Sequence, residues 1–145
     1  MDNGLTLKQM KSWIVQLFTE KGIPNPQIVT DDESIGFFLT LNDGTKGRVV
    51  IVDEGNGLCL LTCLNAFENF MPLDELQWSK SLNAHNLLAD TTNGDGVYYG
   101  MAAQEMNPQS IEELREALGL FVTRLGMATT AFRATLATPT ASSPR

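Results

Sequence analysis

The sequence predicts an α+β fold in which helices pack on one antiparallel sheet. Amphipathic segments with apolar residues at helical spacing stand near both ends of the chain and in its middle. Short apolar runs joined by Gly-containing turns lie between them. The resulting element order is α-β-β-β-α-β-β-α, and a chain of 145 residues has the length of one domain.

The first helix is expected to begin at Thr6, because Thr6 and Gln9 have the spacing of a capping box. An apolar stripe follows at helical spacing, formed by Leu7, Met10, Ile14, Leu17 and Phe18. Gly22 is expected to end the helix in a left-handed conformation, and Pro24 prevents its continuation.

Three strands are predicted next, over residues 36–41, 48–52 and 58–64. Segments 42–44 and 53–57 are rich in Asn, Asp and Gly, and such tight turns make the strands an antiparallel meander. The second and third strands carry apolar side chains on both faces. Because an antiparallel sheet commonly has one wet face, we expect the second face to be covered by a helix, a partner subunit or a client protein.

The second half of the chain is expected to hold two helices and a strand pair. A helix is predicted from Asp74 to about Leu88, with apolar side chains on two sides. Residues 97–103 are expected to form a strand, paired with a short one near residues 89–91. The capping box Ser110–Glu113 begins a long amphipathic helix that runs to Leu136. Residues 1–137 thus form the single expected domain, and the Ala-, Ser-, Thr- and Pro-rich residues 138–145 a flexible tail.

The charge balance limits the classes of partner. The chain has 10 basic and 17 acidic residues, which argues against binding to a nucleic-acid backbone. The first residues are polar and acidic, without the pattern of a secretory signal. The longest nearly apolar run, residues 58–64, is far shorter than the ~20 residues that span a bilayer. We therefore expect a cytoplasmic protein that binds neither nucleic acid nor membrane.

No catalytic, cofactor or metal site is predicted. Cys59 and Cys63 would share a face of one strand roughly 13 Å apart, too far for a disulfide, so we expect buried free thiols and a reducing compartment. His85 is the only histidine and lacks a nearby nucleophile motif, so a hydrogen-bonded helix residue is expected. The acidic residues 31–33 are expected to form a solvated loop rather than a cation site.

Three local features resemble the type III secretion chaperones and the related YbjN-like proteins. The first is the amphipathic opening helix that ends at Gly22, before a three-strand meander. The second is the segment Ser-Leu-Asn-Ala-His-Asn-Leu-Leu at residues 81–88, which is similar to the L-N-x-x-N or L-x-x-N-L-L end of the middle helix in that group. The third is the long last helix over residues 110–136, with Phe132 where the family often has an aromatic residue. The resemblance covers roughly residues 5–137.

The resemblance implies a non-enzymatic, cofactor-free and usually homodimeric protein that holds an extended effector segment on its first helix and its sheet. A YbjN-like regulatory or scaffolding protein, which binds a folded partner or a small ligand, is the alternative, and an enzyme built on His85 is the least favoured hypothesis. For the first hypothesis, the facing of the predicted elements suggests client contacts at Trp13, Phe37, Leu39 and Val50. The same facing suggests dimer contacts at Leu61, Trp78 and Leu82. The sequence does not decide which face of the sheet is exposed, because a shift of one residue in a strand reverses each assignment.

Overall fold

The computed structural model describes residues 7–22, 27–31, 33–41, 44–55 and 58–137. The fold is α+β, as predicted from the sequence. Its elements are α1 Leu7–Glu20, β1 Val29–Thr30, β2 Ser34–Thr40, β3 Lys46–Gly55, β4 Leu58–Asn69, α2 Glu75–Asn83, β5 Leu88–Gly94, β6 Val97–Met106 and α3 Ile111–Ala137. One strand, β1, was not predicted, because two residues are too few to leave an alternating pattern.

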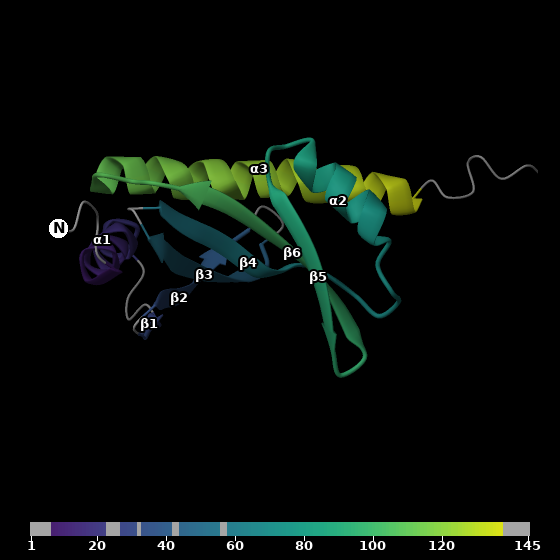
Figure 1. Cartoon of the computed structure of the whole chain (residues 1–145), viewed down its shortest axis with the longest axis horizontal. Coiled ribbons are helices and arrows are strands. Elements are labelled where there is room, and N and C mark those ends of the chain that lie inside the picture. The colour runs from purple at the N-terminus through teal and green to yellow at the C-terminus, as the bar shows by residue number, and fades with distance from the viewer. Residues whose placement is uncertain (1–6, 23–26, 32, 42–43, 56–57, 138–145) are drawn as a thin grey trace, which may run out of the picture.

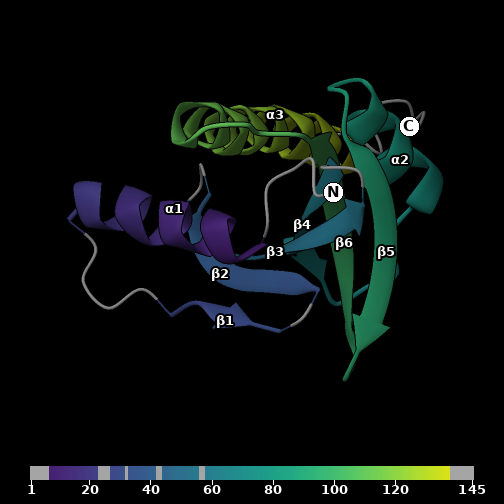
Figure 2. The same cartoon turned by 60° about the vertical axis from the view of Figure 1, so that its left-hand side comes forward.

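The described strands pair antiparallel in the spatial order β1-β2-β3-β4-β6-β5. After β4 the chain passes through α2 to the edge strand β5 and returns through β6, which lies between β4 and β5. In Figure 1, α3 lies along one side of the sheet, with α1 near its start and α2 near its end. Figure 2 shows the twist of the sheet between β1 and β5. The core therefore lies between one face of a twisted sheet and three helices.

The end of α1 follows the prediction from Gly22. This residue has φ 74°, the left-handed conformation that glycine adopts without steric cost. Its backbone N–H donates to the Thr19 carbonyl oxygen at 3.0 Å. Four apolar residues of the predicted stripe are buried, namely Met10, Ile14, Leu17 and Phe18. The expected cap at Thr6 lies outside the described residues.

Helix α2 is shorter than predicted, ending at Asn83 rather than near Leu88. Asn86 has φ 63°, and its N–H donates to the Asn83 carbonyl oxygen at 3.1 Å. The Leu87 N–H donates to the Leu82 carbonyl oxygen at 3.0 Å, which completes a Schellman motif. Leu82 and Leu87 are both buried, as the hydrophobic contact of this motif requires. Leu88 is therefore the first residue of β5 and not the end of a helix.

Strand β4 continues through a bulge beyond its predicted end at residue 64. The pairing of β4 with β6 shifts between Cys63 and Phe67. At the bulge, the Asn65 side chain replaces part of the ladder to β3: its Oδ1 accepts the Arg48 backbone N–H at 2.7 Å, and its Nδ2 donates to the Lys46 carbonyl oxygen at 3.3 Å. The primary amide thus supplies the acceptor and the donor that a regular peptide group would offer.

Trp78 of α2 joins the second half of the sheet to the helices. Its side chain is 0% exposed and packs against Phe67 of β4 and Phe132 of α3, with ring centroids 6.0 and 5.1 Å away. The indole N–H donates to the carbonyl oxygens of Asp90 and Met101, each at 3.1 Å. One side chain therefore contacts α3 and three strands.

The Trp78 ring fits against β6 only because residue 100 is glycine. A Cβ atom added at Gly100 would lie 2.6 Å from two atoms of the indole ring. We expect Gly100→Ala to lower the free energy of unfolding by about 1–3 kcal/mol, because the buried ring has no free space to move into. Urea denaturation measures this change.

Gly119→Ala is the matched control. An added Cβ at Gly119, inside α3, meets nothing within 4 Å. The control should raise the free energy of unfolding by about 0.5–1 kcal/mol, because alanine favours the helix. Equal unfolding midpoints for the two variants would contradict the packing described for Trp78.

A second prediction concerns the bulge. Asn65→Ala removes both side-chain hydrogen bonds to β3 and should lower the free energy of unfolding by about 1–2 kcal/mol. Asn65→Asp keeps the acceptor for the Arg48 N–H and loses the donor to the Lys46 carbonyl. Its free energy of unfolding should therefore lie between those of the wild type and Asn65→Ala. Thermal or urea unfolding in which Asn65→Ala matches the wild type would disprove the role of the amide.

Candidate functional site

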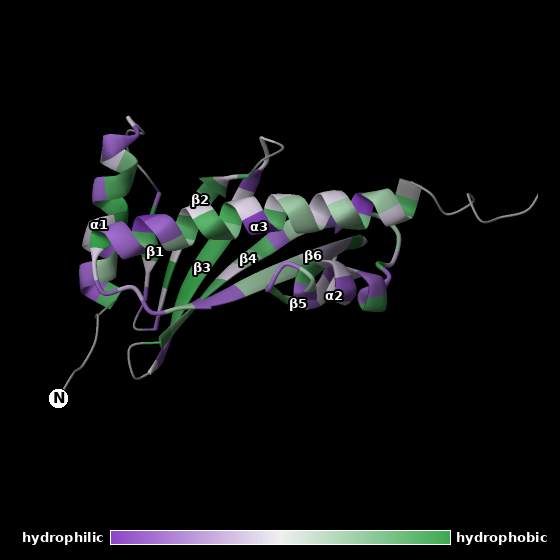
Figure 3. Ribbon diagram, turned by 90° about the horizontal axis from the view of Figure 1, so that it is seen from above, coloured by the Kyte–Doolittle hydropathy of each residue, from purple (hydrophilic) through white to green (hydrophobic). Residues whose placement is uncertain are grey.

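The strands carry apolar side chains on both faces, and the described helices cover only one of them. Buried residues such as Ile35, Ile51 and Leu61 point to the helices. The intervening positions point the other way, to a surface that we call the open face. Its large apolar side chains include Val29, Phe38, Val50, Val52, Leu60, Leu64, Leu88 and Met101. In Figure 3, β3 and β4 are largely coloured as hydrophobic, consistent with apolar residues on both faces.

The open face is substantially accessible to solvent. Val29 is 73% exposed, Phe38 43% and Leu88 52%. Two hollows lie on it: one of about 340 Å³ over β1, β2 and β3, and one of about 270 Å³ over β4, β6 and β5. Large exposed apolar side chains gathered on one face mark an interaction surface more often than isolated ones do.

Charged side chains of both signs lie on the open face. Lys46 and Arg48 lie on β3, at alternate positions that share this face with Val50. Asp90 on β5 and Glu105 on β6 carry the opposite charge. The Asp90 carboxylate also accepts the Thr91 N–H at 2.8 Å. Basic side chains therefore lie on β3 and acidic ones on β5 and β6, and the acidic Asp31 lines the same hollow as Arg48.

The predicted client contacts do not form one surface. Phe37 is 4% exposed and packs edge to face on Phe18 of α1, so its predicted contact with a client is wrong for this fold. Leu39 and Trp13 are half-buried beside the core on the helix side. Val50, also half-buried, is the one of the four that lies on the open face. Phe37 and Leu39 lie on the opposite face of the sheet from Val50, because side chains along a strand alternate between the two faces.

The predicted dimer contacts are part of the core of a single chain. Leu61, Trp78 and Leu82 are each 0% exposed. A second subunit cannot reach them in the folded chain, so this prediction is corrected. The side of α2 that carries Trp78 and Leu82 packs against the sheet and α3 instead, as the position of Trp78 between Phe67 and Phe132 shows. Leu76, on the other apolar side of α2, is 68% exposed.

The two thiols are buried and free, as the sequence predicts. Burial raises the pKa of Cys63 to about 11 from its ordinary value of 9.0, more than the hydrogen bond with Asn65 lowers it. Burial and the nearby carboxylates of Asp53 and Glu54 raise the pKa of Cys59. Both groups therefore stay protonated near neutral pH, and neither is poised as a nucleophile.

The other polar candidates have local structural partners. His85 Nδ1 lies 3.1 Å from the Ser81 carbonyl oxygen, which agrees with the expected hydrogen bond. The residue lies in the turn after α2 rather than in the helix as predicted, because α2 ends at Asn83. The Asp31 carboxylate accepts the backbone N–H groups of Glu33 and Ser34 at 2.8 Å, and these bonds lower its pKa. Asp32 lies outside the described residues. Within the part of the chain that the structure describes, no cluster of His, Cys, Asp and Glu could hold a metal ion.

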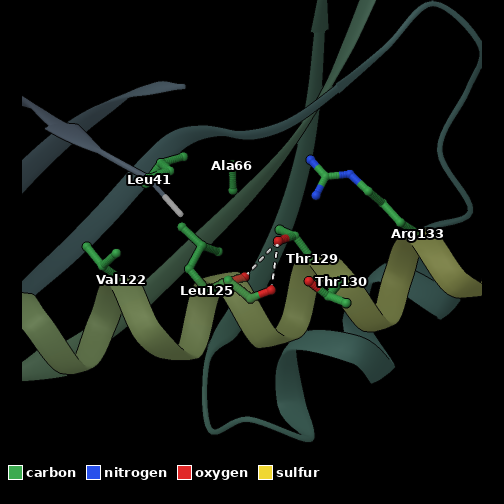
Figure 4. A pocket seen from close by; sticks show the side chains of 8 residues that line it. Leu41, Ala66, Val122, Leu125, Thr129, Thr130 and Arg133 are labelled. Atoms are coloured by element: carbon green, nitrogen blue, oxygen red, sulfur yellow. Dashed lines mark hydrogen bonds between the residues drawn. The ribbon is translucent and has the colours of Figure 1, made fainter. Parts of the chain in front are cut away.

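A smaller pocket lies between α3 and the sheet (Figure 4). Its volume is about 140 Å³. Leu41, Ala66 and Leu125 contribute apolar walls, and Arg133 projects from α3 at one end. The Arg133 guanidinium lies over the Phe67 ring, 5.4 Å from its centroid. This volume is below the roughly 300 Å³ at which small-molecule sites usually begin.

Comparison with known proteins adds no relative. The chain matches no protein-family model, and no curated protein is significantly similar to it. Over the described residues, no helix combines the length and the apolar character needed to cross a membrane. The candidate site therefore rests on the geometry of the open face, of which sequence reasoning identified only Val50. The sequence already showed the apolar character of both alternating sets in residues 58–64, but it did not show which set the helices cover.

The raised pKa of Cys63 predicts a pH dependence of stability. A thiol that titrates near pH 9 in the unfolded chain and about 11 in the fold favours folding fully below pH 9. This contribution, about 2–3 kcal/mol, should disappear as the pH rises from 9 to 11. Urea unfolding of the wild type and of Cys63→Ala is measured across this pH range. The contribution of the thiol is the difference between the slopes of unfolding midpoint against pH for the two proteins. Parallel slopes would contradict the buried, protonated thiol.

Proposed function

We propose that this chain is a non-enzymatic protein-binding module that shields an apolar polypeptide segment of a partner on the open face of its sheet. The single observation that carries the proposal is the apolar open face itself, with Val29, Phe38 and Leu88 between 43% and 73% exposed. The predicted client surface is thereby moved from α1 and the buried side of β2 to the opposite side of the sheet.

The energetics favour an occupant of this face. Removal of apolar surface from water contributes about 25 cal/mol per Å². An extended segment with apolar residues at alternate positions could point them all toward the sheet, because side chains of a strand alternate in direction. Its remaining side chains would face solvent. The hollows of about 340 and 270 Å³ offer room for side chains of this kind.

The resemblance to secretion chaperones supports the same proposal. That group holds extended effector segments, and its element order agrees with the one in this chain apart from the short β1. A cytoplasmic location and a homodimeric state belong to the proposal as well. The YbjN-like alternative, a regulator with a folded partner or a small ligand, is less well supported. The pocket under α3 has only about 140 Å³, and the larger hollows lie on the apolar open face that we assign to the segment.

Fluorescence anisotropy with a labelled synthetic peptide tests this function. The probe is a fluorescein-labelled peptide in which Leu and Ser alternate, and it is titrated with the full chain. Leu88→Lys places a charge on the open face, where the wild-type side chain is 52% exposed. We expect this variant to bind the peptide at least about tenfold more weakly, because a lysine ammonium would have to lose water on binding.

Leu120→Lys is the matched control, since Leu120 is 45% exposed on α3, on the helix side of the sheet. Its affinity for the peptide should equal that of the wild type. A wild-type chain that does not bind the peptide, or equal losses in both variants, would disprove a client site on the open face. Circular dichroism of each variant verifies that it is folded.

A further inference from the structure

One row of paired residues crosses the open face from one edge of the sheet to the other. Its members, in the spatial order of the strands from β1 to β5, are Val29, Gly36, Val50, Thr62, Ala103 and Leu88. The first three line the hollow over β1, β2 and β3, and the last three line the hollow over β4, β6 and β5. The two hollows therefore lie end to end along a path that runs across the strands.

The floor of this path is low, because Gly36, Thr62 and Ala103 are small. The backbone does not require a glycine at position 36, which has no left-handed conformation. A Cβ atom added there would meet only the carbonyl oxygens of Val49 and Val29, at ordinary contact distances of 3.7 and 3.8 Å. Gly36 thus leaves open a space that a larger side chain would fill.

Two residues of opposite charge flank the path on the same side. Arg48 lines the first hollow and Asp90 the second. Arg48 precedes Val50 by two residues and Asp90 follows Leu88 by two, and β3 and β5 run in opposite directions, so both are displaced toward the same end of the sheet. No ion pair among the described residues involves either of them. Another carboxylate at the first hollow, Asp31, is already bound by two backbone N–H groups.

The separation of these charges matches an extended chain that crosses the strands. Three strand spacings lie between β3 and β5, a distance of about 14 Å. Four residues of an extended segment span the same distance of about 14 Å, and side chains four residues apart point in the same direction. A segment laid along β3 would meet Lys46 and Arg48 but not Asp90, and one laid along β5 would not reach Arg48. Only a crossing segment meets both charges.

We infer that the client segment lies extended across the strands along this row, with an acidic side chain at Arg48 and a basic side chain, four residues away, at Asp90. The inference rests on the proposed function, because it gives the orientation and the charge pattern of the same client. An apolar residue midway between the two charges falls over Thr62 and Ala103. Another apolar residue, two positions beyond the acidic one, falls beside Gly36.

Fluorescence anisotropy with two labelled peptides of equal composition tests the crossing. Ser-Leu-Ser-Glu-Ser-Leu-Ser-Lys-Ser carries its charges four residues apart, and Ser-Leu-Ser-Leu-Ser-Glu-Ser-Lys-Ser carries them two residues apart, about 7 Å, which is too close to reach both Arg48 and Asp90. At low ionic strength we expect the first peptide to bind about fivefold more tightly. Added salt should reduce this difference, because the charges are exposed.

Single neutral variants assign the difference to the two charges. Arg48→Gln and Asp90→Asn should each abolish the advantage of the first peptide, because each leaves one ion pair that both peptides can form. Lys11→Gln is the control, since it removes an exposed charge from α1, on the other side of the sheet. This variant should keep the full difference between the two peptides.

Gly36→Val tests whether the segment extends into the first hollow. Valine favours a strand and the added Cβ has room, so the urea midpoint of this variant should equal or exceed that of the wild type. It should bind the first peptide at least about fivefold more weakly, because its side chain fills the space beside the path. A segment along β5 would be unaffected by this change. Unchanged affinity in a folded Gly36→Val chain therefore contradicts the crossing.

The outcomes separate this inference from the proposed function. Equal wild-type affinities for the two charged peptides, or a difference that persists in Arg48→Gln, overturn the crossing orientation. If the Leu-Ser peptide still binds in a manner that depends on Leu88, the proposed function remains intact. A chain that distinguishes the charged peptides but does not bind the Leu-Ser peptide supports the crossing and disproves the shielding of an apolar segment.

Discussion

The packing of Trp78 against Gly100 is the constraint on which the arrangement of the second half of the fold depends. The indole ring occupies the space that a side chain at position 100 would fill, and its N–H bonds to carbonyl oxygens of β5 and β6. Phe132 of α3 packs on the same ring. Helix α2, the last helix and three strands are thereby held together at one point. After α2 ends at Asn83, the left-handed Asn86 turns the chain into β5, where the Asp90 carbonyl oxygen accepts the indole N–H.

All three helices lie on the same side of the sheet: Trp78 and Phe132 join α2 and α3 to it, and Phe18 of α1 packs on Phe37 of β2. The described helices direct their apolar residues to one face, where the residues of the core are collected. The strands are apolar on both faces. Because the described helices all lie on one face, the apolar side chains of the other face have no partner within the described chain. An antiparallel sheet in this situation must be covered by another polypeptide or leave apolar side chains in water. The proposed binding function is a consequence of this imbalance.

The local elements could be predicted from the sequence because their signals are local. Gly22 at the end of α1, the three-strand meander and the free thiols of Cys59 and Cys63 agree with the structure. The contact residues could not be predicted in the same way. Leu61 and Trp78 are large and apolar, as residues of an interface are, but residues of a core have the same character. Only the position of α2 on the helix side of the sheet distinguishes the two roles.

The sequence by itself determined the fold class, nearly all the elements and the apolar character of both faces of the central strands. Only the tertiary structure decided which of the two faces is covered. The physical reason is the two-residue period of a strand, since adjacent side chains of similar hydrophobicity give no preference for one direction. Helix packing breaks this symmetry: Phe37 points to α1 and is buried, whereas its neighbour Phe38 points away and is 43% exposed. The same decision brings Arg48 and Asp90, distant in the sequence, to the same end of one open surface.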